Sequence, residues 1–265
     1  MSDHEKGQVS GSAAEIYEQF FVPALFADWP QHVIAAAEVQ PGEDVLDVAC
    51  GTGVLAREAL IKVGSTGSVT GVDINEGMLA VAREKTPTIT WKSGPAEALP
   101  FEDASFERVM CQFALMFFQD QAKAIAEMQR VTKPGGRASV AVWASLEDTP
   151  GYAEVAKLLN DLFGPEVAQS IEAPYSLGNI DVLHALFESS GIEDISIQSL
   201  DGKARFDSID DWIYTDIKGW TLADVIDDEG FARLKQAAPD RLGQFVQANG
   251  FVEFDAPAHI VSFAV

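Results

Sequence analysis

The sequence predicts an α/β fold in which helices cover both faces of a largely parallel sheet. Between residues 45 and 143, short apolar segments alternate with helix-forming segments. The apolar run 45–49 leads into the turn Cys50-Gly-Thr-Gly53, and a helix-forming segment follows at once. Strands that alternate with helices form right-handed βαβ units, whose strands pair in parallel.

The elements follow in order from local patterns. Residues 13–37 predict a helical segment that Pro23 and Pro30 divide into pieces. Strands are then expected at 45–49, 68–72, 88–92, 107–113 and 137–143, and helices at 54–62, 76–84 and 122–131. Gly64 ends the first of these helices, and the run Lys133-Pro-Gly-Gly136 follows the last.

The regular alternation ends after residue 143. Residues 151–177 predict a helix that gives way to loops, and a further helix covers 180–190. Residues 192–206 alternate like one strand that Asp201-Gly202 interrupts, 208–250 are helical again, and 258–265 form a last strand. This order predicts an edge pair of strands that carries an inserted helical cap.

Composition limits the partners and the location. The chain has 41 acidic and 18 basic residues, a formal net charge of −23. Such a charge repels nucleic acids and anionic membranes, and either solubility or the steering of cationic substrates explains it. The sequence has no membrane-spanning apolar run, no signal peptide and no disulfide framework, so we expect a cytoplasmic protein. It does not predict an oligomeric state.

The glycine turn fits two kinds of cofactor. Gly51-Thr-Gly53-Val-Leu-Ala56 matches G-x-G-x-x-G/A, and Asp73 follows Gly53 by twenty residues, which is the spacing of a ribose-binding acid in NAD(P) enzymes. Asp47, four residues before Gly51, disfavours this interpretation because a carboxylate beneath a pyrophosphate site would repel it. A cationic ligand, such as a sulfonium or an amine, suits Asp47 better.

Four segments of the chain, the glycine turn among them, form a pattern that extends over about a hundred residues. Residues 45–53, 71–79, 94–101 and 133–137 read VLDVACGTG, GVDINEGML, GPAEALPF and KPGGR. Together they resemble the class I S-adenosylmethionine-dependent methyltransferases, and among these the small-molecule enzymes that include the ubiquinone/menaquinone C-methyltransferases. The resemblance covers about residues 40–143. It implies a Rossmann-like sheet of seven strands, mostly parallel with the last antiparallel, and a cofactor at the carboxyl ends of the strands.

The resemblance also implies a domain division. It gives an N-terminal helical cap at 1–39, a cofactor-binding core at 40–145, and a remainder at 146–265 with cap insertions at 146–178 and 208–250. The caps would shape the site of the methyl acceptor.

The same resemblance assigns roles to residues of the cofactor site. Asp47 would hold the ammonium end of S-adenosylmethionine, Asp73 both ribose hydroxyls, and Gln112 would offer a backbone carbonyl to the amino group. The remaining predicted cofactor-binding residues are Tyr17 over the cofactor, Ala49, Gly51, Thr52 and Gly53 in the turn, Ile74 and Met78 beside the adenine, and Ala96 and Glu97 near the adenine ring.

Other features of the reaction stay open in the sequence. Pro95 stands where relatives commonly carry a polar side chain that bonds the adenine, and proline offers neither a side-chain acceptor nor an N–H. No catalytic base is identified and no metal-ligand spacing occurs. Candidates for an apolar acceptor pocket are Phe20, Trp29, Phe117, Trp143 and Tyr152. We therefore expect a methyltransferase for a small molecule; the alternatives are a catalytically silent cofactor-binding protein and an NAD(P) oxidoreductase.

Overall fold

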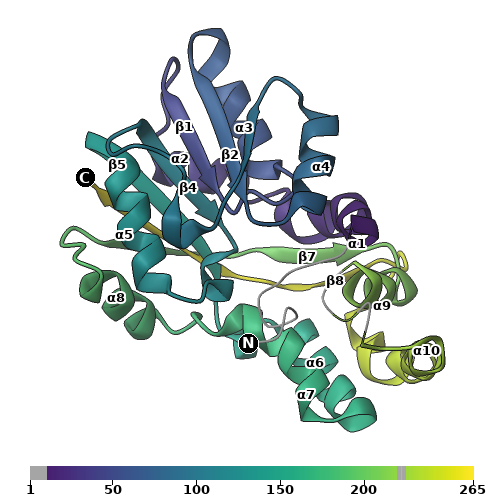
Figure 1. The fold of residues 1–265 in the computed structure, drawn as a ribbon. Helices are drawn as coiled ribbons and strands as arrows, with labels where there is room; N and C mark the ends of the chain where they lie inside the picture. The colour runs from purple at the N-terminus through teal and green to yellow at the C-terminus, as the bar shows by residue number, and fades with distance from the viewer. Residues whose placement is uncertain (1–10, 220–221, 223–224) are drawn as a thin grey trace.

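The computed structural model describes residues 11–219, 222 and 225–265 (Figure 1). Seven strands form the main sheet: β1 (Asp44–Val48), β2 (Ser68–Asp73), β3 (Thr90–Ser93), β4 (Phe106–Gln112), β5 (Thr132–Trp143), β6 (Ser196–Leu200) and β9 (Ala258–Ala264). Their order is β3-β2-β1-β4-β5-β9-β6, and the first five pair in parallel. β9 runs antiparallel to both of its neighbours, so the predicted mostly parallel sheet with an antiparallel last strand is confirmed.

Ten α-helices surround the sheet in the described part of the chain. They are α1 (Gly11–Ile16), α2 (Pro30–Ala36), α3 (Val54–Val63), α4 (Glu76–Lys85), α5 (Gln121–Val131), α6 (Pro150–Phe163), α7 (Pro165–Glu172), α8 (Ile180–Ser189), α9 (Ile209–Lys218) and α10 (Asp228–Leu242). In Figure 1, α9 and α10 lie together at one end of the molecule, and α6 and α7 lie together below the sheet. The segment 151–177 is therefore more helical than its sequence predicts.

The strand order reverses between β1 and β4. The β1-α3-β2 crossover leads one way along the sheet and β4-α5-β5 leads the other way, so right-handed crossovers place α3 and α5 on opposite faces. α2 packs against α3, and α8 packs against α5. A reversal of this kind leaves a crevice at the carboxyl ends of the strands, where ligands of open α/β sheets bind.

A second, two-stranded sheet departs from the prediction of one strand at 192–206. The chain leaves the main sheet after β6, and β7 (Lys203–Phe206) pairs antiparallel with β8 (Val252–Asp255). At the corner, a Cβ on Gly202 would lie 2.4 Å from the carbonyl oxygen of Ala256 and 2.4 Å from the indole of Trp29. The corner needs glycine because no side chain fits between these groups.

The N-terminal segment also differs from its prediction at Pro23. A π-helix, η2 (Tyr17–Phe26), continues through Pro23, whereas Pro30 does begin a new helix at the start of α2. The wide π-helical turn closes with the amide of Ala27 donating to the carbonyl of Val22. Turns of this type often occur at functional sites.

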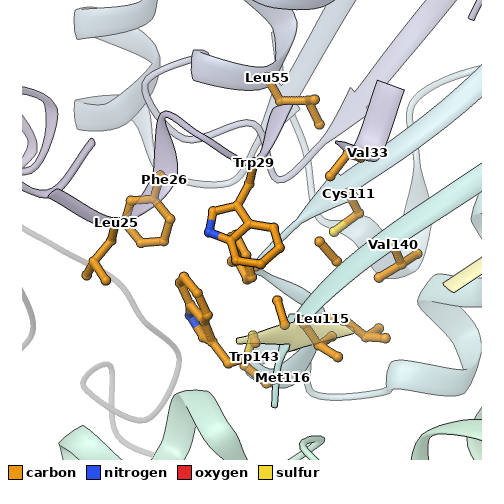
Figure 2. Close-up of a cluster of buried hydrophobic side chains, with 14 of the residues drawn as sticks. Leu25, Phe26, Trp29, Val33, Leu55, Cys111, Leu115, Met116, Val140 and Trp143 are labelled. Atoms are coloured by element: carbon orange, nitrogen blue, oxygen red, sulfur yellow. The ribbon is translucent and has the colours of Figure 1, made fainter. Parts of the chain in front are cut away.

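The core joins the N-terminal segment to the sheet. Phe26 and Trp29 point toward Trp143 at the end of β5 (Figure 2). Trp143 in turn stacks on Phe113, with ring centroids 3.8 Å apart and planes 10° apart. Among the described residues, no helix is both long enough and apolar enough to cross a membrane.

Candidate active site

A cavity lies at the carboxyl ends of the parallel strands, where their order reverses. It encloses about 910 Å³, its mouth to solvent included. Its wall comes from the loop after β1, the ends of β2 and β4, the loop after β3 and the N-terminal segment. Nine of the twelve predicted cofactor-binding residues line it: Tyr17, Ala49, Gly51, Asp73, Ile74, Met78, Ala96, Glu97 and Gln112.

Asp73 ends β2 with both carboxylate oxygens held by backbone amides. Gly51 donates to Oδ2 at 2.8 Å, and Asn75 donates to Oδ1 at 2.7 Å. Asp73 does not cap α4, because the side chain of Asn75 accepts from the first amides of that helix. Each oxygen can accept a further bond from the cavity. Burial raises the pKa of Asp73, and these backbone bonds oppose the rise.

The loop after β1 presents its backbone to the cavity. Ala49 and Gly51 both have a φ of 54°, in the left-handed region, which is uncommon for alanine. A Cβ on Gly51 would have no atom within 4 Å, so the space beside it is open. Strained non-glycine residues tend to cluster at functional sites. This loop is therefore shaped so that a ligand can lie against its main chain.

Gly53 lies away from the cavity, on the side of β3. Its φ is 88°, and a Cβ there would meet the ring of Trp91 at 2.4 Å. Gly71 on β2 faces the same ring, also at 2.4 Å. The structure thus places Gly53 in the packing of the turn and outside the wall of the cavity.

Asp47 and Thr52 lie behind the loop. Each side chain is 1% exposed, and neither lines the cavity. Among the described residues, Oδ2 of Asp47 and Oγ1 of Thr52 have no hydrogen-bond partner. Burial, with the charge of Asp73 as a smaller cause, holds the pKa of Asp47 well above its usual range.

Around Ile74 and Met78 the cavity wall is mainly apolar, and Glu97 adds a polar group at its edge. Ile74 is 57% exposed at the mouth, and Met78 is buried beside α1. Pro95 and Ala96 form the opposite wall. The carboxylate of Glu97 accepts from the amide of Gln119 at 2.9 Å, which ties the loop after β3 to the start of α5.

Tyr17 in the π-helix and Gln112 at the end of β4 form another part of the wall of the first cavity. Tyr17 stacks on Phe26, with ring centroids 5.3 Å apart. Gln112 donates through Nε2 to the carbonyl of Phe26 at 3.4 Å, so the end of β4 and the π-helix are held together. Burial raises the pKa of Tyr17, and the charge of Glu18 adds to the rise.

Several lining residues are absent from the twelve predicted cofactor-binding residues, although Pro95 is a position expected near the adenine and Phe117 a candidate for the acceptor pocket. Asn75, Gly94 and Pro95 extend the wall near Asp73, and Phe113, Ala114, Phe117, Phe118 and Gln119 extend it beyond β4. Phe113 has a φ of 54°, so it shares the unusual backbone conformation of Ala49. Phe113 follows β4 directly in the structure, whereas the expected strand 107–113 includes it; its position at the carboxyl end of that strand is the sequence signal that could identify it.

A second cavity adjoins the first through Phe113 and Phe117, which line both. Its volume is about 490 Å³ with the open solvent at its mouth included, and it is lined mainly by apolar and aromatic side chains. Phe117, Trp143 and Tyr152 line it as predicted candidates, whereas Trp29 packs behind Trp143 and Phe20 packs on Tyr214. The remaining walls come from η2, from α7 and the short helix η7 (Ala173–Tyr175), and from α9.

One acid, Asp216 on α9, belongs to the wall of this aromatic cavity. It is 1% exposed, and the hydroxyl of Tyr152 donates to its Oδ1 at 3.0 Å. Its Oδ2 has no hydrogen-bond partner among the described residues. Burial raises the pKa of Asp216 to about 8, and the bond from Tyr152 and the nearby indole N–H of Trp212 limit the rise.

Replacing Asp216 with asparagine should stabilise the protein, and the gain should grow between pH 4 and pH 8. The native pKa of about 8 lies above the ordinary value of 3.8, so the native state binds more protons than the unfolded state in this interval. Wild-type stability therefore falls as the pH rises through it, and an amide avoids this loss. Thermal melts of both proteins across this range measure the difference. The control Asp210→Asn removes an exposed acid of the same helix, and a gain that does not change with pH would contradict the prediction.

Comparisons with known proteins agree with this geometry. Residues 45–136 match a family model described as a methyltransferase domain. The demethylmenaquinone methyltransferase of Staphylococcus epidermidis is 35% identical over 188 residues, which cover 66% of this chain and 78% of the relative. The enzyme of the same name from Staphylococcus haemolyticus is 37% identical with the same coverage.

Solved structures show the same fold. YcgJ from Bacillus subtilis has a TM-score of 0.59 at 20% identity, over 89% of this chain and 97% of that one. Phosphoethanolamine N-methyltransferase 2 of Haemonchus contortus, in complex with S-adenosyl-L-methionine, has a TM-score of 0.62 at 19% identity. That match covers 96% of this chain and 57% of the Haemonchus chain.

Proposed function

This chain belongs to the class I S-adenosylmethionine-dependent methyltransferases, and we propose that it methylates an apolar, aromatic small molecule bound in the second cavity. The observation that carries the proposal is the contact between the two cavities at Phe113 and Phe117. A donor in the first cavity and an acceptor in the second would meet beside these two rings.

The first cavity fits the cofactor. Two carboxylates, Asp47 and Asp73, lie at or behind its wall without an ion pair among the described residues, so a cationic ligand would compensate them. Asp73 has the two oxygens that a pair of ribose hydroxyls requires, and the open backbone at Gly51 gives room for the methionine part. Ile74 and Met78 on one side and Ala96 on the other would hold the adenine.

Some predicted contacts take a different form in this proposal. Asp47 lies behind the loop, so it would act on the ammonium group by charge through the loop. Thr52 and Gly53 would shape the turn without touching the ligand. Pro95 would contribute a wall and no polar contact, because it has no donor or acceptor to offer the adenine.

The second cavity favours a flat, apolar acceptor. Trp143 and Phe113 stack face to face, and Tyr152 stands edge-on to Trp212 behind the cavity wall. Aromatic walls of this kind stabilise ring-shaped ligands by burial and by ring contacts. The Staphylococcus relatives are named for a quinone substrate, so a naphthoquinol ring is the first acceptor to test.

The side chains between the two cavities would mainly align the methyl donor with the acceptor. S-Adenosylmethionine supplies a methyl group on a positively charged sulfur. Phe113 and Phe117 would hold the acceptor beside that group and keep water away from it. Alignment of two reactants contributes on the order of 7–11 kcal/mol in favourable cases, so it is a large part of the expected acceleration.

The experiment is turnover with methyl-labelled S-adenosylmethionine. We expect label in 1,4-naphthalenediol, or in an aromatic metabolite of a cell extract, identified by mass. Trp143→Ala should still bind S-adenosylhomocysteine but should lose most of this turnover, because it removes a wall of the second cavity alone. Label found only in polar, non-aromatic products would overturn the proposed acceptor class.

A further inference from the structure

We infer that Asp216 selects the acceptor, by accepting a hydrogen bond at its Oδ2 from an O–H or N–H group on an otherwise apolar ring molecule. The inference rests on the proposed function, because it assigns the second cavity to the acceptor. It adds a specificity-determining residue and a chemical requirement on the substrate.

The carboxyl group of Asp216 is buried, and only one of its two oxygens is hydrogen-bonded among the described residues. Asp216 lines the aromatic cavity at 1% exposure, and one of its oxygens is already bonded to the hydroxyl of Tyr152. The other oxygen has no partner in the part of the chain that the structure describes. A buried polar atom without a partner is costly, so its persistence in a ligand cavity indicates a partner that arrives with the ligand.

The carboxyl group of Asp216 is held in place by its neighbours. The ring of Tyr152 lies edge-on to Trp212 and to Phe254, at centroid distances of 6.0 and 5.4 Å. Trp212 itself is completely buried, one helical turn before Asp216 on α9. The hydroxyl of Tyr152 therefore fixes Oδ1 and, with it, the orientation of the whole carboxyl group. A fixed acceptor discriminates between ligands better than a mobile one.

The charge of Asp216 also favours a ligand that carries a hydrogen-bond donor. No ion pair to Asp216 occurs among the described residues, and the rest of the cavity wall carries no ionised group: Tyr152 and Tyr175 stay neutral because burial raises the pKa of each. With its pKa raised to about 8, the carboxyl group is mostly protonated at neutral pH, and a donor on the ligand would stabilise its ionised form. A neutral hydroxyl can do so, and so can a protonated amine, which the surrounding rings would also attract.

The test measures binding of matched probes to the protein saturated with S-adenosylhomocysteine. The hydroxyl arm compares 1-naphthol with 1-methylnaphthalene, which is similar in size but has no donor. The amine arm compares 1-naphthylmethylamine with 1-ethylnaphthalene. The measurement is made at about pH 9, above the raised pKa of Asp216, so that its carboxyl is ionised. In each arm, the affinity ratio of donor to hydrocarbon should then fall at least about tenfold in Asp216→Leu, because a hydrogen bond to a charged group is lost. The arm with the larger fall identifies the kind of donor.

Two further variants keep the test decisive. Asp216→Asn keeps the shape of the side chain but removes the negative charge, so it measures the charge-dependent part of the donor preference if the leucine variant does not fold. Asp210→Asn removes an exposed charge from the same helix and should leave the ratios unchanged. Equal ratios in wild type and both Asp216 variants, with S-adenosylhomocysteine still bound, would overturn the inference and leave the proposed function standing. Failure of the wild type to bind S-adenosylhomocysteine would overturn the proposed function instead, and the probe comparison would still decide the role of Asp216.

Discussion

Asp73→Ala is expected to weaken the binding of S-adenosylhomocysteine by at least about a hundredfold. Under the proposed placement its two oxygens accept both ribose hydroxyls, and a hydrogen bond to a charged group contributes about 1.5–3 kcal/mol. Two such bonds correspond to a hundredfold change or more. Isothermal titration of wild type and variant with S-adenosylhomocysteine measures it.

The control has to separate ligand contacts from the local fold. Asp73 also accepts from the amides of Gly51 and Asn75, so its removal loosens the loop after β1. Asp73→Asn keeps the size of the side chain and should also bind weakly, whereas Glu76→Gln removes an exposed charge three residues away and should bind normally. Unchanged affinity in Asp73→Ala would show that the cofactor lies elsewhere.

Gly53→Ala should destabilise the protein by about 2–5 kcal/mol. The left-handed backbone, at φ 88°, costs a residue with a Cβ roughly 1–2 kcal/mol. The Cβ would also meet the Trp91 ring at 2.4 Å, and overpacking of this kind costs about 1–3 kcal/mol. Urea unfolding followed by fluorescence measures the loss.

A matched pair of variants tests this explanation. Trp91→Ala removes the ring, so Gly53→Ala should cost clearly less in that background, which a double-mutant cycle measures. Gly51→Ala has a left-handed φ but open space around its Cβ, so it should pay the backbone cost alone. If Gly53→Ala costs no more than Gly51→Ala, the contact with Trp91 does not explain the glycine.

The sequence predicts the strands and helices between residues 45 and 143 and most of the residues around the first cavity, for a physical reason. The alternation of strands and helices between 45 and 143 is local, and the carboxyl ends of parallel strands meet at one edge of the sheet. Residues at those ends, such as Asp73 and Gln112, can therefore be placed from their position along the chain. Gly53 shows the limit, because its role depends on Trp91, which a different strand supplies.

The second cavity depends on packing that no local pattern reveals. Tyr152 and Asp216 lie 64 residues apart in the sequence and meet only because α6 and α9 approach the same cavity. The corner at Gly202, which sends β7 into a second sheet, depends on Trp29 from the opposite end of the chain. Both features arise from tertiary contacts: the sequence around Tyr152 and Asp216 reads as ordinary helix, and Asp201-Gly202 indicates an interruption of the strand without indicating a second sheet.

The wall that the two cavities share has a consequence for how such an enzyme changes in evolution. Apart from Tyr17, the residues around the first cavity come from the segment 45–136 that matches the methyltransferase family. Around the second cavity, Phe113 and Phe117 come from that segment, and the other lining residues come from outside it. Under the proposed function, mutations in the outer helices would therefore exchange one substrate for another while the methyl donor stays the same. Phe113 and Phe117 line both cavities, so a change at either position that alters substrate preference would also have to preserve binding of the methyl donor.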